Sequence, residues 1–372
     1  MHYWPRKCGH FGNRELWFRT MPVVTRAFLG ALVAAPFVAL VACSATVRGE
    51  GFGSEGDGGT GASTGRAEDG DNGGIIGNGG DSGAPAPIAG PGEIDLTAVT
   101  PCDADLAVDG DVDDFLKAVG LCKKAESDEE WGILEAGFKD EFGGGTNSKA
   151  AQHGILGRFG DIIEPREGEN LGILSTGWAR EYNDRNGSSQ YFGEGNEWTR
   201  VGSSASSRND MIVLAVKIRV PTNAKSISFD FNFHTSEWPN YVGSQFNDEF
   251  SVHLDGQNIT FDANNNPVNV NNNFFDRCTP NTQLANGERS VCAGGPDELD
   301  GTGFEPLPFG DTTAGGATGW LTTKAPVEPG SVITLEFAIW DAKDQDLDSL
   351  VLIDNFKWDA DPATTGTDRP VN

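Results

Sequence analysis

The chain has 372 residues, which is enough for one large domain with appended segments or for two domains. It contains 55 Asp and Glu against 27 Lys and Arg, a net charge of −28, and 50 glycines. Nucleic acid and anionic lipid repel so acidic a surface, which excludes nucleic acid as a partner. The composition suits an extracellular setting, where divalent cations can bridge surplus carboxylates.

Residues 1–42 have the features of an export signal, with translation expected to start at Met21. A short basic segment precedes an apolar run, residues 27–41, that is too short to span a bilayer. The run ends in Leu-Val-Ala-Cys, which resembles the lipobox of bacterial lipoproteins. We therefore expect cleavage before a lipidated Cys43, and ordinary cleavage with Cys43 incidental is the alternative. Ser44 after the cysteine favours the outer membrane.

Residues 43–92 are rich in Gly, Ser and Asp and have almost no large apolar side chains. Such a segment cannot bury enough surface to offset the entropy lost on ordering. We expect a disordered, flexible tether that holds the folded part away from the membrane.

Residues 93–146 are expected to form a small helical segment. Asp113 and Asp114 suit the first turn of a helix over residues 111–125, and residues 127–138 are interpreted as a second helical stretch. The spacing of Asp109–Asp113 is that of a calcium-loop start, but the required Gly and Glu are absent further on, which favours the helix N-terminus.

Four cysteines of the exported part fall into two local pairs, Cys102 with Cys122 and Cys278 with Cys292. Neither pair has the CxxC or Cys/His spacing of a zinc site. We expect two disulfides formed in an oxidising compartment, and reduced thiols are the alternative.

Residues 147–361 are β-like throughout, with period-two alternation of apolar side chains and turn residues between the runs. Asp255-Gly256 has the composition of a tight hairpin turn. No helical crossovers intervene, so we expect an all-β antiparallel sandwich or jelly roll, with residues 362–372 as a disordered tail. The expected strands are centred on Ile212–Val220, Ile227–Phe233, Phe250–Leu254, Ile333–Ile339 and Val351–Ile353.

One irregular loop, Ser236–Asp248, stands between two of these strands and gathers aromatic, carboxylate and amide side chains. The stretch from Ser236 to Ile259, with Leu171–Gly177 upstream and Asp341–Phe356 downstream, resembles the choice-of-anchor L domain of bacterial surface proteins. The resemblance covers about residues 153–360 and implies a β-rich ectodomain of unassigned activity joined to a membrane or cell-wall anchor. Since the chain ends without an apolar tail, we expect the lipid on Cys43 to be that anchor.

Carboxylates and amides in two loops form a candidate metal site. Clusters of oxygen ligands on loops suit Ca²⁺, which takes six to eight of them. The site requires the sandwich to bring the two loops together, and a solvated acidic loop is the alternative. The candidate ligands are Glu237, Asn247, Asp248, Asp341, Asp344, Asp346 and Asp348.

Two aromatic residues of the first loop, Trp238 and Tyr241, are candidate ligand-binding residues. Together they could form a platform for sugar rings, and packing beneath the loop is the alternative. His153, His234 and His253 lack any accompanying catalytic motif, and we interpret His234 and His253 as exposed strand residues.

These observations predict a lipid-anchored cell-surface protein with a non-catalytic ectodomain for adhesion or for binding a glycan or protein ligand. A secreted hydrolase of polysaccharide and a purely structural envelope protein are the alternatives. A deep cleft with two facing carboxylates would favour the hydrolase.

Overall fold

The computed structural model describes residues 92–96, 100–140, 152–180, 208–272, 274–306 and 313–370, all within one compact unit, residues 81–372. The expected signal peptide, Cys43 and the tether up to residue 91 lie outside the described residues. Within them, no helix is long and apolar enough to cross a membrane.

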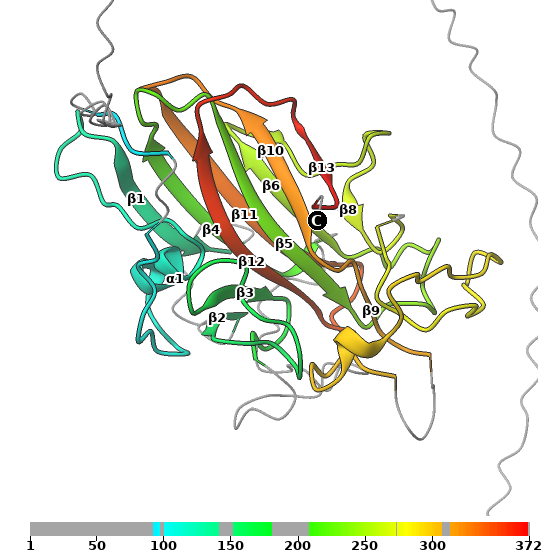
Figure 1. Ribbon diagram of the computed structural model, residues 1–372. Coiled ribbons are helices and arrows are strands. Elements are labelled where there is room, and N and C mark those ends of the chain that lie inside the picture. The colour runs from blue at the N-terminus through cyan, green and yellow to red at the C-terminus, as the bar shows by residue number, and fades with distance from the viewer. Residues whose placement is uncertain are drawn as a thin grey trace, which may run out of the picture. The chain divides into compact units, whose positions relative to one another are not determined.

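Two antiparallel sheets make up the fold (Figure 1), which confirms the all-β sandwich. In the six-stranded first sheet, β8 pairs with β6, and in the seven-stranded second sheet β9 pairs with β5. In order, the first sheet is β1 (Gly132–Lys139), β4 (Arg208–Arg219), β11 (Val332–Ala342), β6 (Glu249–Leu254) and β7 (Gln257–Asn258), with β8 (Val268–Asn269). The second is β13 (Gly366–Asp368), β10 (Leu321–Pro326), β5 (Ser226–Thr235), β12 (Ser349–Asp359), β3 (Leu171–Ser175) and β2 (His153–Leu156), with β9 (Gly316–Ala317).

The main core lies between the two sheets and is built by the alternation visible in the sequence. Phe229, Phe231 and Phe233 of β5 are fully buried in it. The ring of Phe229 meets that of Phe337 on β11 at 5.1 Å, and the ring of Phe231 meets that of Phe250 on β6 at 4.9 Å. Side chains two residues apart point to one face of a strand, so a single strand supplies all three rings.

A second apolar cluster covers the opposite face of β5 and β12, and it overturns the expectation that His234 is exposed. His234 is completely buried, with its ring 5.4 Å from that of Phe159 and 5.5 Å from that of Phe304. These covering residues come from two long connections, the stretch before β3 and the stretch before β9. Strand β5 is therefore covered by protein on both faces, and the side chain of His234 points into the second cluster. His253 is half-buried and His153 stacks on Phe138 at 4.0 Å.

The helical segment is shorter than predicted. Helix α1 spans Val112–Ala118, and the side chain of Asp111 caps it by accepting hydrogen bonds from the amides of Asp113 and Asp114. This confirms the predicted helix N-terminus. The helix ends before Gly120, which has φ +92°, and a Cβ there would lie 3.1 Å from backbone atoms of Phe356, closer than an ordinary contact. The disulfides Cys102–Cys122 and Cys278–Cys292 are both present.

Two predictions about the ends of the domain are wrong. Residues 127–138 are not helical, because Gly132–Lys139 form β1, the edge strand that pairs with β4 and directs Ile133 and Phe138 toward the core. The tail is not wholly disordered, because β13 (Gly366–Asp368) pairs with β10. In both segments, pairing with a sheet edge decided the conformation.

The hairpin is as expected, with φ +49° at Asp255 and +80° at Gly256.

Candidate functional site

The site lies where two loops cross between the sheets at the same end of the sandwich. The loop Ser236–Asp248 leads from β5 in the second sheet to β6 in the first, and residues 343–348 lead from β11 in the first sheet to β12 in the second. Since β5 neighbours β12 and β11 neighbours β6, the two crossings must run side by side. The topology therefore brings together the two loops that the sequence singled out.

Short hydrogen bonds join the loops. The hydroxyl of Ser349 donates to Oδ2 of Asp248 at 2.6 Å, and the amide of Ala342 donates to Oδ1 of the same carboxylate at 2.9 Å. The amide of Ser236 donates to the carbonyl of Asp348 at 3.1 Å. Asp248 thus connects the end of the first loop to both ends of the second.

Four carboxylates at this junction are withdrawn from water. The exposed fractions of Glu237, Asp248, Asp341 and Asp348 are 1%, 0%, 1% and 3%. Asp344 is half-buried and Asp346 is exposed. Burying a carboxylate is costly unless a counter-charge or hydrogen bonds compensate, so a group of four demands a compensating partner.

Many oxygens of these side chains have no such partner. Within the described residues, no hydrogen bond reaches Oε2 of Glu237, either oxygen of Asp341, Oδ2 of Asp348 or Oδ1 of Asp344. Buried polar atoms are normally hydrogen-bonded, and exceptions call for an explanation such as an ion or ordered water. Five such oxygens lie at this one junction, and other exceptions are distributed over the rest of the described residues.

The electrostatics of the cluster are those of crowded like charges. Burial, followed by the charges of Asp248, Asp344 and Asp346, raises the pKa of Glu237 to about 9. Burial also raises the pKa of Asp248 to about 7, although hydrogen bonds from Ser349 and Ala342 oppose the shift.

The pKa of Asp341 is raised well above its usual value by burial and by the charges of Asp248, Asp348 and Asp210. Burial and the charges of Asp210 and Asp248 do the same to the pKa of Asp348. A divalent cation between these carboxylates would lower their pKa values again and favour their ionised forms.

Two residues of the site were missed at the level of sequence. Asp210 on β4 is buried beside Asn209, which pairs with Asp341. Gln152 is also buried, and its amide nitrogen donates to the backbone carbonyls of Ser175, Thr176 and Asp210 at 3.2, 3.0 and 2.6 Å. Oε1 of Gln152 has no partner within the described residues.

One predicted ligand is engaged elsewhere. Oδ1 of Asn247 accepts a hydrogen bond from the amide of Asn271 at 2.9 Å, so this side chain orders the neighbouring turn. Over the ranges that the structure describes, no three histidine, cysteine, aspartate or glutamate side chains are already arranged to hold a metal ion. Ion binding would therefore require carboxylates to rotate toward the ion.

The comparisons with known proteins agree with the motifs around this site. The family model of the choice-of-anchor L domain matches residues 156–357, more than half of the chain. The chain belongs to the choice-of-anchor L family. It is therefore a surface-associated protein of bacteria. No curated protein and no solved structure matches it.

The match assigns both crossing loops to the choice-of-anchor L domain, and leaves α1, β1 and β13 outside it. It also includes Gly177, the last residue of the upstream motif. A Cβ on Gly177 would collide with the carboxylate of Asp348. The glycine therefore gives this buried carboxylate its room.

The two candidate ligand-binding aromatics of the choice-of-anchor L domain lie in different surroundings. Trp238 is buried and stacks on Phe275, with 4.6 Å between ring centroids and 9° between planes. Gly316 makes room for it, because a Cβ there would lie 2.7 Å from the indole. Tyr241 is half-buried and meets Phe246 edge-on at 5.2 Å. The packing alternative thus describes Trp238, and Tyr241 remains accessible.

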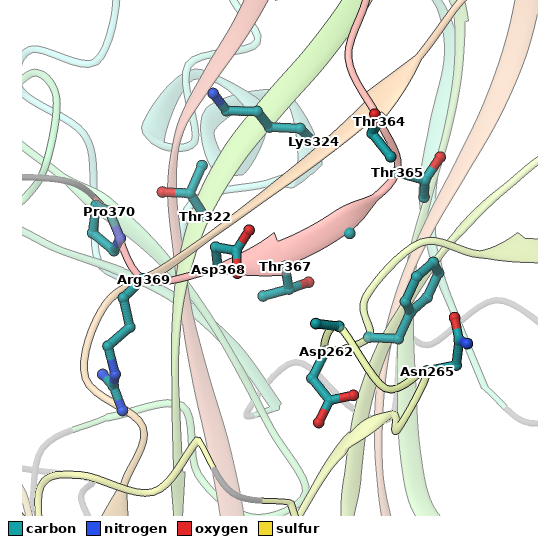
Figure 2. A pocket seen from close by; sticks show the side chains of 13 residues that line it. Asp262, Asn265, Thr322, Lys324, Thr364, Thr365, Thr367, Asp368, Arg369 and Pro370 are labelled. Atoms are coloured by element: carbon teal, nitrogen blue, oxygen red, sulfur yellow. The ribbon is translucent and has the colours of Figure 1, made fainter.

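A groove of about 670 Å³ lies between the segment Phe261–Asn265, strand β10 and residues 364–370 (Figure 2). It contains two carboxylates, those of Asp262 and Asp368. Burial opposes ionisation of Asp262, but hydrogen bonds from Asn266 and Asn264 outweigh it and hold the pKa below its usual value. A carboxyl group with a lowered pKa is unsuited to act as a general acid.

Proposed function

We propose that this chain is a non-catalytic binding module of the bacterial cell surface whose ligand-facing loop is held in place by Ca²⁺. The observation that carries the proposal is the set of buried, unpartnered carboxylate oxygens at the junction of the two crossing loops. Ca²⁺ prefers carboxylate and carbonyl oxygens and tolerates irregular geometry. The donor set of the junction fits this ion, since it contains oxygen atoms and no sulfur or imidazole nitrogen among the groups named above.

The burial of the carboxylates favours a cation-holding role over acid–base catalysis. A general acid or base must come within hydrogen-bond distance of the substrate. Glu237, Asp248, Asp341 and Asp348 are at most 3% exposed, and their loops are tied together by hydrogen bonds. An ion between them would fix the loop Ser236–Asp248 against β12.

The proposed ligand surface is the accessible part of that loop, centred on Tyr241 and Phe246. Both rings are half-buried and support one another edge-on, which leaves part of each available for contact. Aromatic rings contribute large contact areas to sugar and protein ligands. Trp238 lies beneath the loop and supports it from within.

Calcium dependence is tested by titration calorimetry and thermal unfolding of the metal-stripped full-length chain. A ligand at 100 times its Kd stabilises a protein by about 2.7 kcal/mol, so Ca²⁺ should raise the melting temperature by roughly 5–10 °C and chelator should reverse the rise. Asp341→Asn should abolish most of this shift, whereas the exposed groove variant Asp368→Asn should retain it. Absence of both heat and melting shift in the wild type would remove the proposal.

Ligand binding is tested separately on glycan and surface-protein arrays, with wild type and Tyr241→Ala compared in saturating Ca²⁺. We expect Tyr241→Ala to lose at least tenfold in affinity for whichever glycan or protein the wild type retains. Equal binding by the two proteins would show that the ligand surface lies elsewhere on the domain. If the wild type retains no ligand on the arrays, a purely structural envelope role is favoured.

A polysaccharide hydrolase is the second candidate, because the groove in Figure 2 has the volume of a small-ligand site and two carboxylates. New reducing ends from a panel of bacterial polysaccharides, lost in Asp368→Asn, would establish it. The lowered pKa of Asp262 argues against this chemistry.

A further inference from the structure

We propose that the carboxylate cluster binds two divalent cations that share Asp248: an inner ion at Asp210, Asp341 and Asp348, and an outer ion at Glu237, Asp344 and Asp346. The inference rests on the proposed cation-dependent function and goes beyond it, because it states how many ions bind, where each one lies and which residues hold it. Its inner half depends on β4, which lies outside both crossing loops.

The first argument is the amount of charge. Seven carboxylates belong to the cluster, and charges from this set act on Glu237, Asp248, Asp341, Asp344 and Asp348. Ca²⁺ completes its shell with six to eight oxygens, several of which are usually carbonyls or waters. A single ion would leave most of the seven charges uncompensated in a space where compensation is needed.

The second argument is that the cluster divides into two neighbourhoods. The charges acting on Asp341 are those of Asp248, Asp348 and Asp210. Those acting on Asp348 are those of Asp210 and Asp248. Those acting on Glu237 come from Asp248, Asp344 and Asp346. Asp248 is the member common to both, and it lies between the two loops through its bonds to Ala342 and Ser349.

The inner neighbourhood has the oxygens of an enclosed site. Asp341 is buried with two unpartnered oxygens, and Oδ2 of Asp348 is unpartnered over Gly177. Gln152 adds a neutral oxygen: its amide nitrogen is held by the carbonyls of Ser175, Thr176 and Asp210, while Oε1 is buried without a partner within the described residues. An amide oxygen fixed in this way suits a hard cation.

The outer neighbourhood is more open. Oε2 of Glu237 is buried and unpartnered, as is Oδ1 of the half-buried Asp344, whereas Asp346 is exposed. An ion there would connect the two crossing loops and meet water on one side. We therefore expect the outer ion to exchange faster than the inner ion.

The test is the calcium content of the full-length chain after equilibrium dialysis, with circular dichroism as the check on folding. We expect two ions per wild-type chain, and one ion in each of two paired variants, Asp210→Asn/Asp341→Asn and Glu237→Gln/Asp344→Asn. The two variants should differ in the rate at which they exchange Ca²⁺. The first variant retains the outer ion, which exchanges fast, and the second retains the inner ion, which exchanges slowly. Asp368→Asn is the control and should retain both ions.

The outcomes separate this inference from the proposed function. No bound ion in the wild type overturns both. One bound ion overturns the two-ion inference alone and leaves the calcium-held loop intact. Two ions that are both lost in each paired variant overturn the division into inner and outer positions. Should a paired variant fail to fold, the single variants Asp210→Asn and Asp344→Asn, each expected to weaken only one ion at least tenfold, decide the division.

Discussion

His234 shows how strongly a covering segment can change the chemistry of one side chain. Its imidazole lies between the rings of Phe159 and Phe304, and Nε2 has no hydrogen-bond partner within the described residues. Burial lowers its pKa to about 3, although the carbonyl of Asn232 opposes the shift. The folded protein therefore keeps this histidine neutral at pH values where an unfolded chain protonates it.

This burial predicts a loss of stability in acid. The folded pKa is below the unfolded value of 6.5, so the stabilisation is complete above pH 6.5 and is lost as the pH falls toward about 3. The slope from this one group is about 1.4 kcal/mol per pH unit. Urea denaturation at several pH values should show a steeper decline for wild type than for His234→Gln. The matched control His253→Gln, on a half-buried histidine, should decline nearly as wild type does; parallel curves for all three would contradict the prediction.

At this scale the sequence singled out the carboxylates that the two crossing loops bring together, because these acidic residues stand in short, recognisable stretches. Asp210 and Gln152 could not be found in the same way. They join the site through the pairing of β4 with β11 and through backbone carbonyls of β3, which are long-range contacts with no local signal. His234 was misjudged because the segments that bury it are distant in sequence.

Among the elements, the loop Ser236–Asp248 combines a buried anchor and an accessible tip. Trp238 packs on Phe275 beneath the loop, and the Asp248 carboxylate fixes its end to Ala342 and Ser349. Tyr241 and Phe246 occupy the part between them. The loop therefore has rigid ends and an exposed centre, which is an arrangement suited to presenting a binding surface.

The two aromatics should respond differently to truncation. Trp238→Ala removes a buried aromatic ring and should cost about 3–5 kcal/mol in the free energy of unfolding. Tyr241→Ala removes a half-exposed ring and should cost about 1 kcal/mol or less. Equilibrium urea unfolding measures both. A small loss in Trp238→Ala, equal to that in Tyr241→Ala, would show that the loop is not anchored as described.

The strands that alternate clearly, such as Ile212–Val220 and Ile333–Ile339, were predicted because one face of each packs into the core. Residues 127–138 were not, since their apolar residues fit a helical spacing as well as a strand. Their conformation is decided by the open edge of β4, which local sequence does not report. The same applies to β13, whose three residues pair with β10.

For the whole molecule, the antiparallel sandwich followed from strands without helical crossovers, whereas strand order depended on pairings between distant segments. That order places the crossings β5–β6 and β11–β12 side by side and so creates the candidate site. Attachment to the membrane belongs to this scale as well, and the residues expected to provide it lie outside the described part of the chain.

Lipid attachment predicts where the protein partitions in a bacterial host. With Cys43 intact, the exported chain should sediment with the outer membrane and yield an acylated N-terminal peptide by mass spectrometry. Cys43→Ser should release it into the soluble fraction. Cys8→Ser, which lies before the expected translation start at Met21, should leave partitioning unchanged. Persistent membrane association of Cys43→Ser would exclude lipid on this residue as the anchor.

The disulfide Cys102–Cys122 also determines how the domain would bear tension. A pull arriving from the N-terminal side first meets contacts that include the hydrogen bonds between Thr222 and Gly92 and between Asn223 and Ile94. Once these break, the load passes at residue 102 across the sulfur bridge directly to residue 122. Residues 103–121, with α1 among them, are then bypassed and cannot be extended, so the covalent link passes the load on toward β1 at the edge of the first sheet.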